Sequence, residues 1–427
     1  MTPIQRNWAG NITYSSQNWL QPHSLEELQE QVQQAQKVRV VGTRHSFNHI
    51  ADSPYTNIDV TGMDRISNLD LVHHTVTIEA GVRYGELAIL LDKAEVALHN
   101  LASLPHISVG GAISTATHGS GVNNGNLSTA VIAMELVTAD GSLLTLSQAS
   151  DAERFAGAVV GLGAVGIISK LTLKIEPTYN IAQTVYLNLP HAVLETDFDA
   201  VMASGYSVSL FTDWRGESVN QVWVKRRIDA EKEVDAVVDD GAFFGAMPAT
   251  NASHPITGVS PEYCTEQLGV VGAWYERLPH FQLRFTPSNG DELQSEYIVP
   301  REHALDAFHA IKSMGADIAP HLLTSEIRAI AADNLWLSSS YQRDSVAFHF
   351  TWKQEWDAVK PLLARIEAHL MPLNARPHWG KLFTMSHAYL KTQYPKWDDF
   401  IALLDDLDPH GKFRNPFINR AIFGVDA

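Results

Sequence analysis

The stretch Val38-Arg-Val-Val-Gly-Thr-Arg-His-Ser-Phe-Asn48 runs from a β-branched segment into a turn at Gly42. Small and polar residues after a strand let successive backbone N–H groups point at an anion. His45 stands in the turn itself. The pattern therefore predicts a strand over 38–41, followed by a backbone cradle for a phosphate-bearing cofactor.

A second stretch of the same character is Ser103-Leu-Pro-His-Ile-Ser-Val-Gly-Gly-Ala-Ile-Ser-Thr-Ala-Thr-His-Gly-Ser-Gly121. Gly110, Gly111 and Gly119 allow close backbone approach, and the Ser and Thr hydroxyls between them can donate hydrogen bonds to a pyrophosphate. Two such stretches in one chain support each other. We expect both to contact the same cofactor.

Composition narrows the class of protein. A chain of 427 residues, 45% of them hydrophobic, is long enough for a sizeable core and two domains. The net charge of −17 argues against nucleic acid or an anionic membrane as a partner, because such binding depends on Lys and Arg, and it favours a monomer. Cys264 is the only cysteine, which excludes an internal disulfide and a thiolate metal cluster.

The chain shows neither a signal-peptide pattern nor an apolar run long enough to span a bilayer. A cytoplasmic location is expected. The first part alternates helix and strand. The apolar residues of 24–36 recur at helical spacing, and Ser24 and Glu27 form a capping-box pattern, so a helix is expected here. Further expected elements are a strand over 76–81, a helix over 84–94 and a hairpin over 132–146 that turns at Asp140-Gly141.

The pattern changes near Tyr179, where irregular stretches with more aromatic residues begin, and a second domain is the natural interpretation. Residues 231–261 look like a long surface excursion, since they combine acidic residues with Gly, Pro and Asn. Helices are expected over 301–314 and 356–370, and a strand over 345–352.

The segment Gly161-Leu-Gly-Ala-Val-Gly166 fits the G-x-G-x-x-G pattern of dinucleotide-binding Rossmann folds. Its context is wrong for that fold, because a Rossmann loop leaves a strand and opens a helix. Here a helix is expected over 151–160 and a strand over 167–175, and no acidic residue follows about twenty positions downstream. We reject the Rossmann interpretation.

Taken in order, these features resemble the FAD-binding domain of the vanillyl-alcohol oxidase type flavoproteins. Motifs over nearly the whole chain are similar to those of the bacterial alditol (xylitol) oxidases. They are Asn7-Trp-Ala-Gly-Asn-Ile-Thr-Tyr14, Leu101-Ala-Ser-Leu-Pro-His-Ile-Ser108, Phe211-Thr-Asp-Trp214, Ser325-Glu-Ile-Arg328, His349-Phe-Thr-Trp352 and Pro377-His-Trp-Gly-Lys381. Sugar-lactone oxidases share the cofactor domain and the Trp-Gly-Lys motif.

The resemblance implies an α+β fold of two domains. A PCMH-type FAD-binding domain is expected over 1–178, and a substrate (cap) domain, built on a mixed or antiparallel sheet with flanking helices, over 179–379. Leu407-Asp-Pro-His-Gly-Lys-Phe-Arg-Asn-Pro-Phe417 resembles the family's closing motif, so residues 380–427 are expected to return to the FAD domain and the site. An exposed C-terminal tail is the alternative.

The resemblance also implies FAD attached covalently through His45, because a histidine nitrogen can bond to the flavin 8α carbon. Three alternatives stay open: His45 beside noncovalent FAD, a metal site with His49, which lacks a third ligand, and an ordinary surface histidine of the turn. Thr43-Arg44 replaces smaller residues of many relatives, and Arg44 either tightens pyrophosphate binding or crowds the loop. The implied FAD-binding positions are Val41, Gly42, Thr43, Arg44, His45, Ser46, Ser103, Ser108, Gly111, Ser114, Thr117, His118, Gly119, Gly166 and Ile168.

Two pairs of polar residues lie two positions apart on expected strands, Glu326 with Arg328 and His349 with Thr351. Residues at this spacing share a face, so the four side chains predict a polar pocket floor that suits a ligand rich in hydroxyls. The alternative is a solvated strand face with an Arg–Glu ion pair.

By resemblance, Lys381 and Arg328 stabilise the alkoxide that develops on O1 of the substrate. Glu326, His349, Thr351 and Ser103 would anchor the rest of the polyol, and Ala102 is the small residue that admits O2. The candidate catalytic residues are Lys381, Arg328, Glu326 and His349. No metal is expected.

The implied activity is oxidation of the terminal primary alcohol of an alditol, such as xylitol or sorbitol, to the aldose, with O2 reduced to H2O2. A sugar-1,4-lactone oxidase or dehydrogenase on the same scaffold is one alternative. A flavin- or sugar-binding protein without turnover is another.

Overall fold

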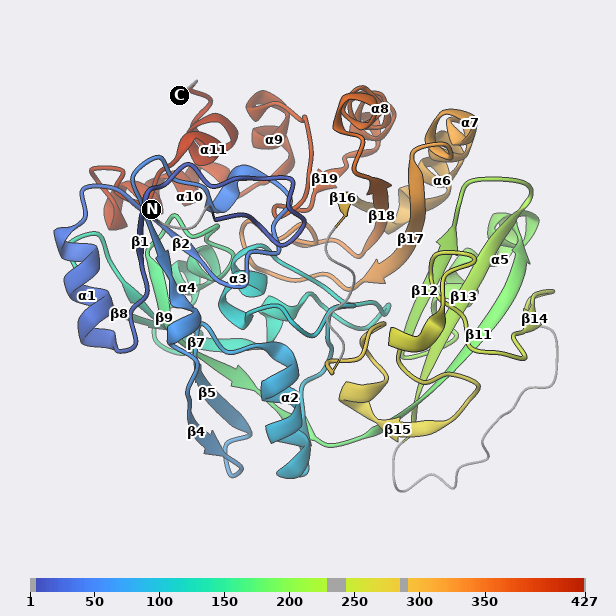
Figure 1. Cartoon of the computed structure of the whole chain (residues 1–427), viewed down its shortest axis with the longest axis horizontal. Coiled ribbons are helices and arrows are strands. Elements are labelled where there is room, and N and C mark those ends of the chain that lie inside the picture. The colour runs from blue at the N-terminus through green and yellow to red at the C-terminus, as the bar shows by residue number, and fades with distance from the viewer. Residues whose placement is uncertain (1–4, 229–242, 285–290, 426–427) are drawn as a thin grey trace.

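The stretch 38–48 forms β2 (Val38–Val41) and then a loop, as its composition predicts. The structure is a computed structural model that describes residues 5–228, 243–284 and 291–425 (Figure 1). Strand β2 pairs in parallel with β3 (Thr56–Asp59), which pairs in parallel with β1 (Asn18–Leu20). Helix α1 (Leu25–Gln34) starts at the predicted cap, where the Ser24 hydroxyl accepts a hydrogen bond from Glu27 N.

A second sheet of five antiparallel strands follows, and the predicted strands, helices and hairpin of this part are confirmed. Figure 1 shows this sheet beside the parallel one, in the same half of the molecule. Its order is β4 (Ile66–Asp70), β5 (Thr75–Glu79), β9 (Ile167–Lys174), β7 (Val131–Val137) and β8 (Leu143–Ser147). The helices of this half are α2 (Tyr84–Lys93), α3 (Val109–Ser114) and α4 (Ala152–Val159), and β6 (Val96–Ala97) pairs with β10 (Glu176–Pro177).

The other half of the molecule is built on one large antiparallel sheet, which confirms the expected sheet with flanking helices. Its order is β14 (Met247–Pro248), β11 (Asn180–Pro190), β13 (Ser218–Ile228), β12 (Ser207–Thr212), β17 (Leu322–Ile330), β18 (Ser345–Lys353), β16 (Glu292–Pro300) and β19 (Arg376–Pro377), and β15 (Val271–Ala273) pairs with β11. Along its outer side in Figure 1 lie α5 (His191–Met202), α6 (Ala304–Ser313), α7 (Gly315–Ile318) and α8 (Trp356–Leu370).

The C-terminal segment crosses back to the first half, as Figure 1 shows. It contains α9 (His387–Gln393), α10 (Trp397–Leu407) and α11 (Pro416–Ile418). Lys412 O accepts a hydrogen bond from Val38 N at 2.9 Å, and the Asn415 side chain donates to Asp52 O at 2.7 Å. This segment is therefore packed against the edge of the parallel sheet. Among the described residues, no helix is both long and apolar enough to cross a membrane.

The glycine-rich segment 161–166 joins α4 to β9, so its helix-to-strand context is confirmed and the Rossmann interpretation stays rejected. The segment is tied to the rest of the fold by Arg39, which is buried on β2. The Arg39 guanidinium donates to the carbonyls of Leu162 and Gly163, each at 2.8 Å, and to Phe413 O at 2.9 Å. It also donates to Ile50 O. One side chain thus joins four parts of the chain around the first cradle.

Replacement of Arg39 is predicted to destabilise the protein. Arg39→Met leaves four buried carbonyls without their donor, and we expect the free energy of unfolding to fall by about 3 kcal/mol. Urea unfolding followed by tryptophan fluorescence measures the change. Arg365→Met is the matched control: Arg365 is half exposed in an ion pair with Asp317, so its loss should change stability by less than about 0.5 kcal/mol. Equal stability of Arg39→Met and the wild type would contradict the role given to Arg39.

Candidate active site

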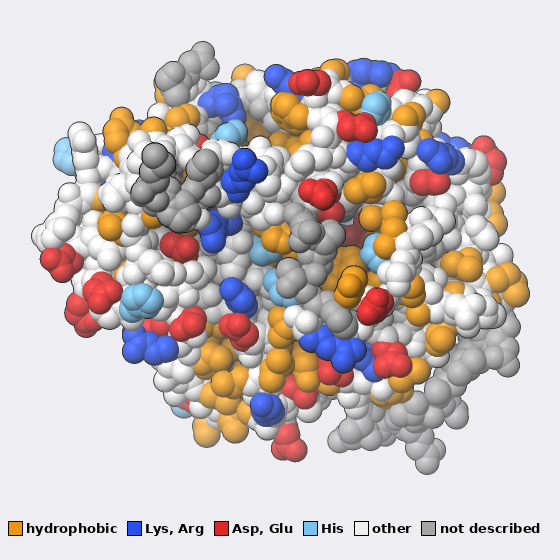
Figure 2. Space-filling model, in the orientation of Figure 1, with side chains coloured by type: hydrophobic (Ala, Val, Ile, Leu, Met, Phe, Trp, Pro, Cys, Tyr) orange, Lys and Arg blue, Asp and Glu red, His pale blue; other side chains and the backbone are white. Residues whose placement is uncertain are grey.

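A cavity of about 620 Å³ lies where the two halves meet, within the size range of cofactor and ligand sites. In the space-filling view of Figure 2, acidic and basic side chains are interspersed over this face, and hydrophobic and histidine side chains gather near its centre. The cavity is lined by both predicted cradles and by the polar face of the large sheet. It therefore brings together the two groups of residues that the sequence singles out.

All but one of the predicted FAD-binding positions line the cavity. The exception is Gly119, where an added Cβ would lie 2.4 Å from Leu101 O. Gly119 thus lets its own segment pack closely against the segment of Leu101, and it does not face the cavity. The lining positions are Val41, Gly42, Thr43, Arg44, His45, Ser46, Ser103, Ser108, Gly111, Ser114, Thr117, His118, Gly166 and Ile168.

The two cradles form one surface because they bond to each other. Ser108 N donates to Thr43 Oγ1 at 2.9 Å, and Thr43 N donates to Ser108 Oγ at 3.4 Å. A Cβ on Gly42 would lie 2.2 Å from Ser108 Oγ, so the loops approach this closely only with glycine at this position. The glycine that the sequence marks as a turn is also what allows the second loop to pack here.

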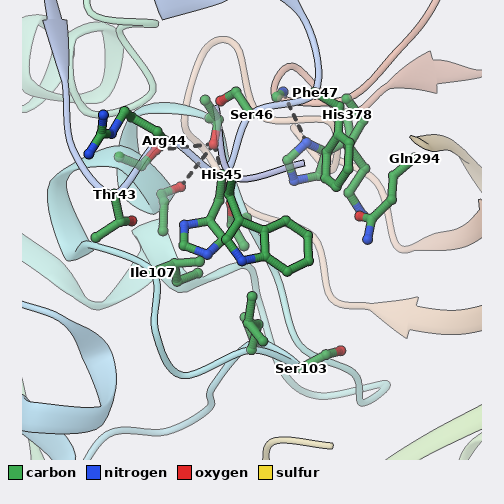
Figure 3. A pocket seen from close by; sticks show the side chains of 18 of the residues that line it. Thr43, Arg44, His45, Ser46, Phe47, Ser103, Ile107, Gln294 and His378 are labelled. Carbon is green, nitrogen blue, oxygen red and sulfur yellow. Dashed lines mark hydrogen bonds between the residues drawn. The ribbon is translucent and has the colours of Figure 1, made fainter. Parts of the chain in front are cut away.

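His45 projects into the cavity, as Figure 3 shows, and stacks on Trp8 with 5.3 Å between ring centroids. Both ring nitrogens are buried, and neither has a hydrogen-bond partner within the described residues. Burial lowers the pKa of His45 to about 4, so the imidazole is neutral and its nitrogen lone pair is available to a ligand. A buried, unpartnered histidine beside a glycine cradle fits the expected flavin.

The geometry of this loop bears on two of the open questions, the metal site with His49 and the position of Arg44. His49 is largely exposed, lies 3.5 Å from Asp52 and is absent from the residues that line the cavity, so it forms no metal site with His45. The Arg44 guanidinium donates to the Gln5 side chain, and Figure 3 shows the Arg44 side chain directed away from His45. Arg44 therefore holds the N-terminal segment and does not crowd the loop.

The polar floor arises from strand register. On the neighbouring strands β16, β18 and β17, Glu296, His349 and Glu326 lie directly opposite one another. Residues two positions away on the same strands share this face, so Arg328 and Thr351 also line the cavity. The two predicted pairs therefore share one face, as their spacing predicts, and that face is buried, which rules out the solvated alternative.

Glu296 links the cations of the floor, although the sequence analysis did not identify it. One carboxylate oxygen accepts from Arg328 at 2.5 Å and the other from Lys381 Nζ at 2.7 Å. His118 Nε2 lies 3.3 Å from the first oxygen. Burial opposes ionisation of Glu296, but Lys381 and Arg328 outweigh it and hold the pKa of Glu296 well below its usual range. The carboxylate therefore stays charged and balances both cations.

Lys381 reaches the floor from a segment fixed to the first cradle. Phe47 N donates to Gly380 O at 2.8 Å, and the Asn48 side chain donates to Lys381 O at 2.6 Å. Lys381 Nζ also lies 2.8 Å from His349 Nδ1. Burial lowers the pKa of Lys381 and of His349. The ammonium donates, so His349 carries its proton on Nε2, 3.0 Å from Thr351 Oγ1.

The sequence analysis missed several further lining residues. Glu292, Gln294 and Glu296 alternate along β16, a polar period-two pattern that could have revealed them. His280 and His378 lie in irregular segments, and no local pattern marks them. The expected surface excursion is corrected in part: residues 229–242 lie outside the described residues, whereas the later part of 231–261 contributes four residues to the cavity, because Gln221 and Thr324 bond its carbonyls to the large sheet. These are His254, Pro255, Ile256 and Val259.

Comparisons with known proteins agree with this geometry. Residues 17–147 match the FAD binding domain family, and residues 288–421 match the D-arabinono-1,4-lactone oxidase family. An alditol oxidase from a Streptomyces species is 47% identical over 428 residues, 99% of this chain and 100% of the relative. The chain belongs to the alditol oxidase family. It is a FAD-binding flavoprotein, and the resemblance found in the sequence is confirmed.

More distant relatives of the family are also similar to this chain. An L-gulono-1,4-lactone dehydrogenase from Mycobacterium tuberculosis is 29% identical, with coverage of 99% of this chain and 100% of the relative. A cholesterol oxidase structure from B. sterolicum has a TM-score of 0.74 at 15% identity and covers 98% of this chain and 96% of that one. At that identity the likeness shows the fold alone, and it confirms the predicted two-domain α+β fold.

Proposed function

We propose that the chain is a FAD-dependent alditol oxidase, which converts the terminal primary alcohol of a polyol such as xylitol or sorbitol to the aldose and reduces O2 to H2O2. The observation that carries the proposal is the single cavity that joins His45 and the glycine cradle to a buried floor of Glu296, Glu326 and Arg328. The relative that is 47% identical over its full length supports the same activity.

We propose that residues 1–178 form the FAD-binding domain and 179–379 the substrate-binding domain. Residues 380–427 return to pack on the FAD domain and the site, to which they contribute Lys381. The cradle residues 41–46 and 108–117 would bind FAD through backbone N–H groups and hydroxyls. When bound, FAD supplies a two-electron acceptor for the hydrogen that leaves the alcohol carbon as hydride.

Within this site, Lys381 and Arg328 are placed to hold the oxygen of the reacting alcohol. Arg328 donates to Glu296 from one nitrogen, and Lys381 donates one of its hydrogens to the same carboxylate. Both side chains have further N–H groups that can donate to a ligand. As the hydroxyl proton is lost, negative charge develops on that oxygen, and two cations beside it stabilise the transition state more than the neutral alcohol. Glu326, His349, Thr351 and Ser103 provide donors and acceptors for the remaining hydroxyls.

A second candidate function is oxidation or dehydrogenation of a sugar-1,4-lactone. The match of residues 288–421 to a lactone oxidase family favours it. Turnover of a 1,4-lactone faster than xylitol, or dependence on a dye acceptor in place of O2, would select it.

We also propose that the chain is a cytoplasmic monomer, given its single cysteine and strong net charge. Analytical ultracentrifugation tests the oligomeric state, and cell fractionation tests the location.

Lys381→Met is predicted to slow flavin reduction by xylitol more than about 100-fold, because it removes a cation from the developing alkoxide. Anaerobic stopped-flow absorbance of the flavin band measures this rate. Lys353→Met is the matched control, since Lys353 is exposed at the end of β18 and donates to Pro320 O, so its rate should equal that of the wild type. Reduction of Lys381→Met at the wild-type rate would refute the assignment.

We propose that FAD is bonded covalently to His45, whose ring is neutral and unpartnered. Acid precipitation of the wild type should leave the yellow colour in the pellet. His45→Ala should release its flavin into the supernatant after the same treatment, and flavin that separates from the wild type would show that His45 only contacts noncovalent FAD.

We propose that Ala102, a buried residue of the cavity wall, leaves space for O2 beside the cofactor. Ala102→Val fills that space, and we expect reoxidation of the reduced enzyme by O2 to slow about tenfold while reduction by xylitol changes less. Double-mixing stopped flow separates the two half-reactions. Unchanged reoxidation would contradict this role.

A further inference from the structure

A second Lys–His pair lies beside the polar floor: His280 lines the cavity, and Lys225 lies behind it, outside the lining. Lys225 on β13 is 1% exposed, and its ammonium donates to Leu278 O, to Pro279 O at 3.3 Å and toward His280 Nδ1 at 3.2 Å. It thus holds three consecutive residues of one loop. The His280 ring is also held edge-on by Phe211 and Trp223, with centroids 5.4 and 5.2 Å away.

The contacts of His280 fix where its proton lies. Burial lowers the pKa of Lys225 to about 7, so Lys225 is an ammonium below neutral pH. An ammonium has no lone pair, so in this form the facing nitrogen, His280 Nδ1, is the unprotonated one. Burial lowers the pKa of His280 to about 4, which leaves the ring neutral with its single hydrogen on Nε2. That hydrogen points at Glu326 Oε1, 2.8 Å away. Because Lys225 occupies Nδ1, His280 can only donate to Glu326.

The same arrangement occurs on the other side of the floor, where Lys381 occupies Nδ1 of His349. The two pairs differ in access to the site. Lys381 lines the cavity, whereas Lys225 does not and touches the site only through His280. His280 N in turn donates to Ser103 O at 3.0 Å, which fixes its loop to the predicted substrate loop.

We propose that Lys225 and His280 are positioning residues that keep Glu326 ionised and able only to accept hydrogen bonds from the polyol. The proposal rests on the proposed function and adds a rule of specificity: the substrate hydroxyl at Glu326 must donate its hydrogen. His280 and Arg328 still pair with Glu326 when that hydroxyl is replaced by hydrogen, but one acceptor site of the buried carboxylate is left without a donor, which costs binding.

Glu326 is near several charged groups, and the effect of Lys225 on it adds to theirs. Arg328 Nε lies 3.5 Å from Glu326 Oε2. Without Lys225, the His280 hydrogen can move to Nδ1, and the Nε2 lone pair then opposes the carboxylate. Protonation of Glu326 relieves this repulsion, so loss of Lys225 raises its pKa. The other groups around this cluster are His349, Lys381 and, next to Lys225, the Cys264 thiol.

Lys225→Met tests the proposal. We expect KM for xylitol to rise about tenfold while kcat changes less than about threefold, since a binding contact is weakened. Lys353→Met should leave KM unchanged.

Two substitutions of His280 separate positioning from packing. The amide of His280→Gln can still donate to Glu326 without help from Lys225, and we expect its KM to stay within about threefold of the wild type. His280→Leu has no donor and should raise KM as Lys225→Met does. Equal losses in both His280 variants, or an unchanged KM in folded Lys225→Met, would overturn the proposal.

The protonation state of His280 can also be measured without turnover, so the positioning role is tested even if a variant fails to fold or no polyol reacts. In the ¹⁵N spectrum of histidine-labelled wild type, the ring signals lost in His280→Gln should have the pattern of a neutral Nε2–H imidazole at neutral pH. An Nδ1–H or doubly protonated pattern would overturn the positioning role, even where Lys225→Met does not fold. If no polyol reduces the wild type but the Nε2–H pattern is present, the proposed function fails and the fixed orientation of His280 stands.

Discussion

The site depends on the bridge that Glu296 makes between Arg328 and Lys381. The bridge connects β16 and β17 of the large sheet to the segment that ends at Lys381, and that segment is bonded to the loop of His45. Burial of a carboxylate and two cations costs several kcal/mol per ion unless each is paired and hydrogen-bonded. Such a cluster adds little net stability. In the proposed function, it holds positive charge beside the alkoxide that develops on the substrate.

The hydrogen bonds of the floor around this bridge run in the same direction at two histidines. In each of two histidines, Nδ1 accepts a hydrogen bond from a lysine, so the ring hydrogen lies on Nε2. His349 then donates to Thr351, and His280 donates to Glu326. The acceptors and donors that face a ligand are therefore set before it binds. A substrate with a hydroxyl on every carbon can satisfy such a surface, whereas a group lacking hydroxyls leaves buried polar atoms unpaired.

Local patterns in the sequence predicted the elements that carry the site. The β-branched strand before Gly42, the capping box at Ser24 and the two-residue spacing of Glu326 with Arg328 depend on neighbours in the chain, and the structure contains all three. Context also decided the G-x-G-x-x-G segment correctly. Its true partner, Arg39, lies more than a hundred residues earlier and left no local mark.

The rest depended on contacts between distant segments. Glu296 meets Arg328 and Lys381 only because β16 pairs with β18 and β18 with β17, a register that the sequence alone does not give. His280 and His254 come from irregular loops whose path is set by packing against the large sheet. The polar alternation of Glu292, Gln294 and Glu296 could have revealed this face of β16, but it is short, because the strand continues into the buried core residues Tyr297 and Ile298.

The most direct test of the account is the visible absorbance of the purified protein under anaerobic conditions, before and after addition of xylitol. The account predicts that a flavin band bleaches with xylitol and recovers when air is admitted, with one H2O2 formed for each alcohol oxidised. A flavin band that xylitol leaves unchanged and a sugar-1,4-lactone bleaches would contradict it, and would assign the buried floor to a lactone.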